Sequence, residues 1–168
     1  MPMQEIINRR SIRSYRSDAV TEEQIEQILR AAMAAPSAGN QQPWEFIVVT
    51  ERSLLTKITE VHPYSKMLHE APAAIVVCGN LSREEHVDYW IQDCSAAVQN
   101  ILLEATHQGL GSIWLGVHPR PDRVAGLKKL FKLPEPVIPF AVVALGHAKE
   151  QPPPVDRFNS AYIHRNEW

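Results

Sequence analysis

The 168-residue chain is predicted to form a single domain that combines α-helices with β-strands. Short apolar runs have the length of buried strands, and amphipathic patterns of helical period alternate with them. A chain of this length normally forms one domain with its own core. The expected strands lie at 46–50, 73–78, 113–115 and 140–145. The expected helices lie at 2–8, at 21–33, at 54–61, from 90 to near 109, and at 123–131.

The clearest helix signal begins at Thr21, which forms a capping-box pattern with Gln24. Apolar side chains then recur at helical spacing and predict a core-facing stripe. That stripe consists of Ile25, Ile28, Leu29, Ala32 and Met33. The helix expected from Trp90 is apolar or small over most of its surface. It is therefore either the central helix of the domain or half of a subunit interface, and both can hold.

Charge and composition exclude several classes of partner. The net charge of -2 and the pI near 6.4 give no bulk attraction to nucleic acid or anionic membranes. No apolar run approaches the length of a membrane span, and the first residues lack an apolar leader, so we expect a cytoplasmic protein. Cys78 and Cys94 lack metal-ligand spacing and are expected to be buried, reduced and structural.

The polar loop at 34–44 connects the first long helix to the first strand. Pro36 ends the helix, because proline lacks a backbone donor and clashes with the preceding turn. Amide and hydroxyl groups follow, and Gly39 lets backbone N–H groups come close to a ligand. This chemistry suits recognition of a polar heterocycle, although an ordinary connecting loop has the same composition. The polar residues are Ser37, Asn40, Gln41 and Gln42.

A cluster of arginines occupies residues 9–16 with no acid among them. The helix expected at 2–8 leads into this segment, and we expect Arg9, Arg10 and Arg13 to lie on adjacent helical rows. Arg9 and Arg13 could then close on one phosphate, with Ser11 adding a hydroxyl. A solvated basic helix end is the alternative. A nucleic-acid patch is less well supported, because aromatic interleaving and global basic charge are both missing.

Other motifs exclude some kinds of ligand site. The spacing of Gly109, Gly111 and Gly116 is neither a Rossmann fingerprint nor a P-loop. Residues 113–115 instead predict a strand closed by Gly116, where backbone N–H groups can face a ligand ring. The seven histidines show no metal-ligand spacing, so no metal site is expected. The irregular segment 62–69 could border a pocket or form a plain surface connection.

The last residues are unusually apolar for a chain end. Three prolines follow Gln151, and large side chains come after them that water would solvate poorly. Eighteen extended residues reach up to about 60 Å, against a radius of gyration of about 15 Å for such a domain. The tail is therefore long enough to wrap around a partner subunit. Its large apolar residues are Val155, Phe158, Tyr162, Ile163 and Trp168.

Together these stretches resemble the short single-domain members of the FMN-dependent nitroreductase family. The resemblance spans essentially the whole chain and depends on the order and spacing of five motifs. These are the segment 9–15, the loop 35–44, the segment 93–97 with Asn100, residues 109–116, and a tail that contains Asp156-Arg157-Phe158 and ends in Trp168. It implies an α+β fold with a mixed, largely antiparallel sheet flanked by helices. It also implies an obligate dimer with two FMN sites at the interface.

The resemblance assigns residues to parts of the cofactor. Arg9, Arg10, Ser11 and Arg13 correspond to the grip on the phosphate and ribityl chain, with Arg157 from the tail. Pro36, Ser37, Ala38, Asn40 and Gln42 correspond to the partner subunit's contribution. Trp114, Leu115 and Gly116 correspond to the backbone wall that faces the flavin N5 and O4 edge. Tyr162 stands where the family pattern has an arginine, so the resemblance does not predict a second tail contact to the phosphate. Residues 1–150 would form the FMN-binding domain, and residues 151–168 a tail that docks on the partner subunit.

The implied activity is hydride transfer from NAD(P)H through FMN to a nitroaromatic or quinone-like acceptor. No catalytic side chain is expected, because the flavin itself carries the hydride. A single pocket without a dinucleotide fold favours ping-pong kinetics, with Tyr64 and Met67 as candidates for the pocket rim. Two alternatives stay open. One is an FMN-binding module without turnover, and the other is a dedicated flavin reductase, dehalogenase or enone reductase.

Overall fold

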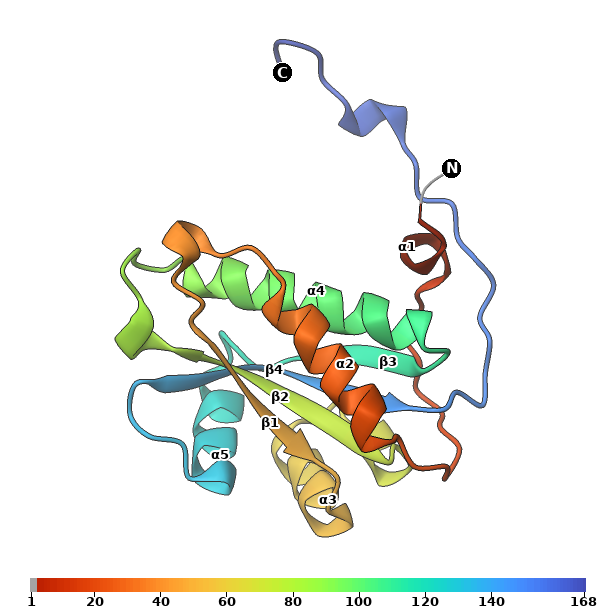
Figure 1. Cartoon of the computed structure of the whole chain (residues 1–168), viewed down its shortest axis with the longest axis vertical. Coiled ribbons are helices and arrows are strands. Elements are labelled where there is room, and N and C mark those ends of the chain that lie inside the picture. The colour runs from red at the N-terminus through yellow and green to blue at the C-terminus, as the bar shows by residue number, and fades with distance from the viewer. Residues whose placement is uncertain (1–2) are drawn as a thin grey trace.

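The computed structural model describes residues 3–168 and has an antiparallel sheet at its centre (Figure 1). The strands of this sheet are β1 (Trp44–Val49), β2 (Ala73–Asn80), β3 (Gly111–Gly116) and β4 (Val137–Gly146). Their order is β1-β2-β4-β3, and each neighbouring pair is antiparallel. The predicted α+β fold with a largely antiparallel sheet is confirmed. A parallel pairing occurs as an isolated bridge between Ser11 and Ser112.

Helices cover both faces of the sheet, so the domain has three layers. The helices α2 and α4 pack on one face, and α3 and α5 pack on the other (Figure 1). The short helix α1 lies beside the C-terminal end of α4. Their bounds are α1 (Gln4–Asn8), α2 (Glu22–Met33), α3 (Arg52–Val61), α4 (Trp90–His107) and α5 (Pro121–Phe131).

Strand β2 is the middle of the core and is buried on both sides. Its successive side chains point to opposite faces. Ile75 and Val77 join the cluster under α2 and α4, while Val76 and Cys78 join the cluster under α3 and α5. This double burial explains why the sequence there is continuously apolar rather than alternating.

Both cysteines are buried and unpaired, as predicted. Burial raises the pKa of the Cys78 thiol to about 12 and raises the pKa of Cys94 as well. Thiols of this kind are poor nucleophiles, so they serve as small core side chains.

The capping box at the start of α2 is confirmed. The Thr21 hydroxyl accepts from the Gln24 backbone N–H at 3.2 Å, and the Gln24 side chain accepts from the Thr21 N–H at 3.0 Å. Ile25 and Ile28 are buried as predicted, but Met33 is 52% exposed, so its assignment to the core was wrong. It is the last residue of α2, where the helix runs beyond the packed surface.

Helix α4 is buried on several sides, as its sequence predicts. Its small residues allow α2 of the same chain to approach, with Ala97 fully buried. The Asn100 side-chain amide donates to the Ala31 carbonyl of α2 at 2.9 Å. The partner helix for this part of the small face is therefore α2, and it no longer argues for a subunit interface.

The arginine segment is extended, so the prediction that Arg9, Arg10 and Arg13 lie on helical rows is wrong. Helix α1 ends at Asn8. Beyond it the Ile12 N–H donates to the Ser112 carbonyl at 3.0 Å, and the Arg16 N–H to the His147 carbonyl at 2.8 Å. The segment follows the edge strand β3, whose free backbone groups offer partners that a short helix could not replace.

Residues 151–168 leave the body and run past α1 into open space (Figure 1). They contain a short 3₁₀ turn at Ser160–Tyr162. Phe158 is 77% exposed, Tyr162 is 81% exposed and Trp168 is fully exposed. Within residues 3–168, none of the helices combines the length and apolarity needed to cross a membrane.

Candidate functional site

A cavity of about 660 Å³ opens at the end of the edge strand β3. Four separate parts of the chain form it: the extended segment 9–16, the turn after α3, β3 and the start of α5. The residues that line it are Arg13, His62, Pro63, Tyr64, Lys66, Met67, Ile113, Trp114, Leu115, Gly116 and Arg123. This volume is typical of a small-molecule or cofactor site.

Gly116 closes β3 and leaves its backbone accessible from the cavity. A Cβ placed at this position would meet no heavy atom within 4 Å. The space beside the strand end is therefore free for a ligand to approach the main chain. Leu115 and Trp114 continue the same wall along β3.

His62 fixes the carbonyl group of Gly116. Its Nδ1 accepts from the Tyr64 N–H at 3.3 Å, and its Nε2 lies 2.9 Å from the Gly116 oxygen. Nε2 must then carry the hydrogen and donate it. Burial lowers the pKa of His62, and the nearby charge of Arg123 adds to that decrease. The imidazole is thus held neutral and in one orientation at neutral pH.

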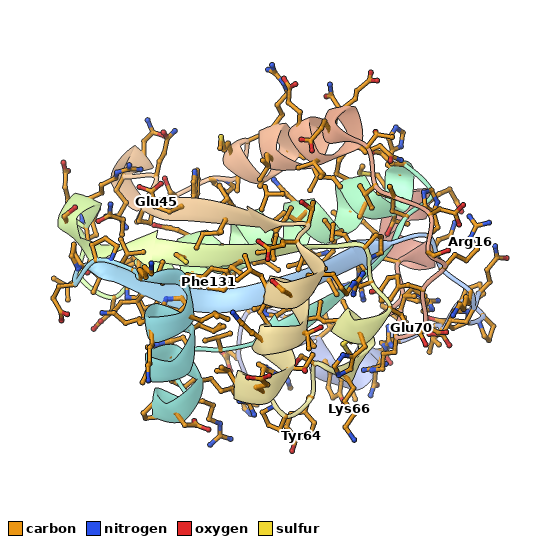
Figure 2. The ribbon with its side chains drawn as sticks, turned by 90° about the horizontal axis from the view of Figure 1, so that it is seen from below. Arg16, Glu45, Tyr64, Lys66, Glu70 and Phe131 are labelled. Carbon is orange, nitrogen blue, oxygen red and sulfur yellow. The ribbon has the colours of Figure 1, made fainter. Side chains whose placement is uncertain are left out.

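Arg123 reaches the same carbonyl from α5. Its Nη1 donates to the Gly116 oxygen at 2.7 Å, and its guanidinium carbon lies 5.4 Å from the centre of the Tyr64 ring. Its Nε is buried and has no partner among the described residues. Figure 2 shows Tyr64 and Lys66 projecting from the turn beyond α3, where they form the outer rim.

The cavity is electropositive. Arg13, Lys66 and Arg123 line it, and the lining contains no carboxylate. Within residues 3–168, none of these three side chains has a carboxylate oxygen within the 4.0 Å of an ion pair, whereas Arg30 and Arg83 each have one at 2.6 Å. A concave site with unpaired cations attracts anionic ligands.

The structure separates the residues predicted to grip a phosphate. Arg13 lines the β3 cavity, and Ser11 and Arg9 precede it on the same extended segment. Arg10 lines a different cavity, and its Nε donates to the Pro153 carbonyl at 2.9 Å. Arg157 lines a third cavity together with Arg10. Arg10 therefore ties the N-terminal segment to the tail in this structure.

The predicted polar loop is clamped to the start of α4 by Asp93. This buried carboxylate accepts from the Ala38 N–H at 2.9 Å and from the Gln41 side-chain amide at 2.7 Å. The side-chain oxygen Oε1 of Gln41 in turn accepts from the backbone N–H groups of Glu85 and His86. Three segments are thereby joined, so the loop is rigid.

The clamped loop directs its remaining polar groups outward. The Gln42 side-chain amide donates to Asn40 at 3.0 Å, and the Gln42 N–H donates to the Ser37 hydroxyl at 3.1 Å. Both Asn40 and Gln42 have positive φ, at 56° and 46°. None of the loop residues Pro36, Ser37, Ala38, Asn40 and Gln42 lines the β3 cavity of the same chain.

A comparison with known families decides the affiliation. The model of the Nitroreductase family matches residues 6–147. The chain belongs to the nitroreductase family. This confirms the resemblance inferred from the sequence motifs.

Individual nitroreductase relatives match over nearly their full length. A protein of Methanothermobacter thermautotrophicus with the provisional name NADH dehydrogenase/NAD(P)H nitroreductase is 51% identical over 166 residues, covering 99% of this chain and 87% of its own. The NADH dehydrogenase of Thermus thermophilus is 31% identical over 189 residues, covering 90% and 88%. The solved FMN-dependent nitroreductase of Clostridium difficile R20291 is 29% identical with a TM-score of 0.91, covering 99% of this chain and 100% of that one.

The interpretation of the segment 62–69 as a pocket border is confirmed, although sequence reasoning gave no role to His62 or Lys66 and missed Arg123. All three line the cavity, but His62 and Lys66 lie in an irregular turn and Arg123 in an ordinary amphipathic helix. Tyr64 and Met67 do line the cavity, as do Trp114, Leu115 and Gly116. Their contacts with FMN or an acceptor remain predictions.

Proposed function

We propose that this protein is an NAD(P)H-dependent flavin oxidoreductase that binds FMN in the cavity at the end of β3. Family membership supports the class of enzyme, and the FMN-dependent nitroreductase relative supports the cofactor. The observation that carries the assignment is the cavity itself, which combines unpaired cations, flat apolar side chains and an open backbone edge.

The residues present fit the chemistry of FMN. A phosphomonoester needs charge-assisted donors, which Arg13 supplies at the cavity, with Arg9 and Ser11 on the same extended segment. A flat ring needs an apolar wall and backbone donors, which Trp114, Leu115 and Gly116 supply at the end of β3. The contributions of Arg10 and Arg157 are the weaker part of the proposal, because the Arg10 guanidinium is already bound to main-chain carbonyls.

Bound FMN would supply the chemistry of accepting and releasing a hydride, and the protein would supply binding, orientation and charge. Arg13 and Lys66 place positive charge around the site. His62 and Arg123 hold the Gly116 carbonyl, and with it the end of β3, in one position. No side chain of the cavity needs to act as a nucleophile or as a general base.

The polar loop would complete the site from a second subunit. Pro36, Ser37, Ala38, Asn40 and Gln42 form a rigid surface that does not reach the cavity of its own chain. A homodimer in which this loop faces the partner's cavity would bring both halves together. The exposed apolar tail at 151–168 supports such an assembly, because Phe158 and Trp168 need a cover.

The substrates would be NAD(P)H and a nitroaromatic or quinone-like acceptor, with Tyr64 and Met67 at the rim. One cavity would serve both in turn, which gives ping-pong kinetics. Initial rates over a grid of NADPH and acceptor concentrations test this. Parallel double-reciprocal lines are expected, and intersecting lines would contradict the single-cavity mechanism.

The cofactor assignment is tested by replacing Arg9 and Arg13 together with Ala. The purified variant should be folded but nearly free of FMN, whereas the natural protein should be yellow and release FMN on heating. A matched control replaces Arg30 and Arg83 with Ala. This control removes the same number of positive charges at positions outside the cavity. Full flavin content in the Arg9 and Arg13 variant would contradict the phosphate assignment.

An FMN-binding module without turnover is the alternative from another class. Anaerobic mixing of the holoprotein with NADH or NADPH separates the two. Loss of the flavin colour is expected for the oxidoreductase, and persistent colour would favour the module. Activity with a panel of nitroaromatics, quinones and enones would then distinguish a broad reductase from a dedicated one.

A further inference from the structure

We infer that the β3 cavity selects aromatic acceptors that carry an anionic group, and that Arg123 receives this group. The inference rests on the proposed function, since it names the substrate class of the same site. It concerns a wall of the cavity that the cofactor assignment leaves unused.

The cations of the cavity come from different walls. Arg13 belongs to the extended segment 9–16 and is assigned to the flavin phosphate. Arg123 belongs to α5, and Lys66 belongs to the turn after α3. A phosphate bound at Arg13 therefore leaves the other two cations without an assigned anion.

Arg123 is held in place but is not neutralised. Its Nη1 donates to the uncharged Gly116 carbonyl at 2.7 Å, and its Nε is buried without a partner in the described part of the chain. Burial lowers the pKa of its neighbour His62, and within residues 3–168 the adjacent Asp122 does not come within ion-pair distance. A half-buried guanidinium in this situation gains most from a carboxylate or sulfonate that replaces lost water contacts.

The surroundings of Arg123 also define the body of the ligand. The Arg123 guanidinium lies over the Tyr64 ring and the His62 ring packs edge-on against it, while Tyr64 is still 71% exposed. Met67 and Trp114 add apolar area to the same cavity. A planar aromatic ring fits between these side chains, with its anionic substituent directed to Arg123.

Lys66 is the competing cation, and two observations favour Arg123. Lys66 is exposed on a flexible stem, so it loses more conformational freedom on binding. Arg123 is already fixed by the Gly116 carbonyl and the Tyr64 ring, and its planar fork matches a carboxylate.

The test compares 4-nitrobenzoate with 4-nitrobenzamide, which have similar shape but differ in charge. The quantity measured is the ratio of their kcat/KM values, so that differences in intrinsic reactivity cancel between variants. Arg123→Gln should lower this ratio by about tenfold or more, the size of one lost charge-assisted hydrogen bond. Arg123→Lys should keep part of it. Arg120→Gln, which removes a charge three positions away outside the cavity, should leave it unchanged.

Binding without turnover gives an independent readout. Calorimetric titration of the oxidised holoenzyme should show tighter binding of benzoate than of benzamide, and Arg123→Gln should abolish that difference. Flavin content and melting temperature establish that each variant is folded. If the enzyme reduces none of the nitroaromatics, quinones and enones of the panel, the proposed function fails, while the benzoate titration still tests Arg123.

Any of the following results would overturn the inference. One is an equal loss of kcat/KM for both acceptors in Arg123→Gln, which leaves their ratio unchanged, and the same holds for an unchanged preference for benzoate in the titration. Another is a collapse of the ratio in Lys66→Gln but not in Arg123→Gln. The third is an effect of Arg123→Gln on NADPH relative to NADH with the acceptor ratio unchanged, which would assign Arg123 to the phosphate of the donor.

Discussion

The β3 cavity and the loop 36–42 are built in opposite ways. The cavity is concave, gathers four separate segments and leaves three cations without acidic partners. The loop has its inner hydrogen bonds satisfied through Asp93 and Gln41, and it directs Asn40 and Gln42 outward. The proposed homodimer would bring the outward amides of the loop to the cavity of the partner subunit.

The backbone of the loop supports this interpretation. Asn40 and Gln42 adopt positive φ although neither is glycine. Such conformations cost energy and persist where the surrounding contacts determine them, often at binding surfaces. The contacts with Asp93 and Ser37 hold the loop in this conformation, as the proposed contact with a partner subunit requires.

The largest effect is expected from Asp93→Ala, which removes hydrogen bonds of the loop and changes no residue of the cavity. The Ala38 N–H and the Gln41 amide would lose their acceptor, so the free energy of unfolding should fall by about 2–4 kcal/mol. Flavin content should fall as well. Chemical denaturation and the visible spectrum measure both, and Glu85→Ala in a neighbouring exposed position serves as control. Unchanged stability and flavin content would show that the clamp does not hold the loop.

Two glycine substitutions should distinguish the role of the loop 36–42 from the role of the β3 cavity. Gly39→Ala introduces a side chain at φ 53° that would clash with the His86 ring, so stability should fall by about 1–3 kcal/mol. Gly116→Ala adds a methyl group in open space. It should leave the melting temperature nearly unchanged but weaken FMN binding, measured by reconstitution of the apoprotein. Full binding in Gly116→Ala would mean that the ligand does not approach this strand end.

His62 should make the cavity sensitive to acid. Its pKa is lowered in the folded state, so below the ordinary value of about 6.5 the unfolded chain takes up a proton more readily. The contribution of neutral His62 to stability is therefore present above about pH 6.5 and is lost as the pH falls. His62→Gln should remove this part of the pH dependence, and His164→Gln in the tail should not. Identical stability profiles for the natural protein and His62→Gln would contradict the lowered pKa.

The smallest effect is expected from Thr21→Ala, which touches neither region. Loss of the cap should cost about 1 kcal/mol in thermal or chemical unfolding. Flavin content and kcat should not change. A loss of flavin in this variant would mean that stability alone controls cofactor content, and it would weaken the conclusions from Asp93.

Local patterns made most of the fold predictable. The strands, the long helices and the capping box at Thr21 depend on neighbouring residues, so their signals are present in short stretches of sequence. The arginine segment was misjudged because its conformation depends on pairing with β3, about a hundred positions away. Helical spacing alone could not reveal that edge.

The candidate site was only partly predictable for the same reason. Gly116 and Trp114 belong to a recognisable strand end, and the loop carries a recognisable motif. His62 and Arg123 meet at one carbonyl only because the ends of α3 and β3 and the start of α5 lie near one another. No spacing in the sequence reports that convergence.

The most direct test of the central claim mixes two defective chains. One chain carries Arg9→Ala and Arg13→Ala in the cavity, and the other carries Asn40→Gly and Gln42→Gly in the loop, where glycine keeps the positive φ. Each variant alone should bind little FMN. If the site combines the cavity of one subunit with the loop of the other, a mixed dimer contains one intact site and should hold roughly half of the natural FMN content. Absence of FMN from the purified mixed dimer would contradict the account, because it would mean that each site is built within a single chain.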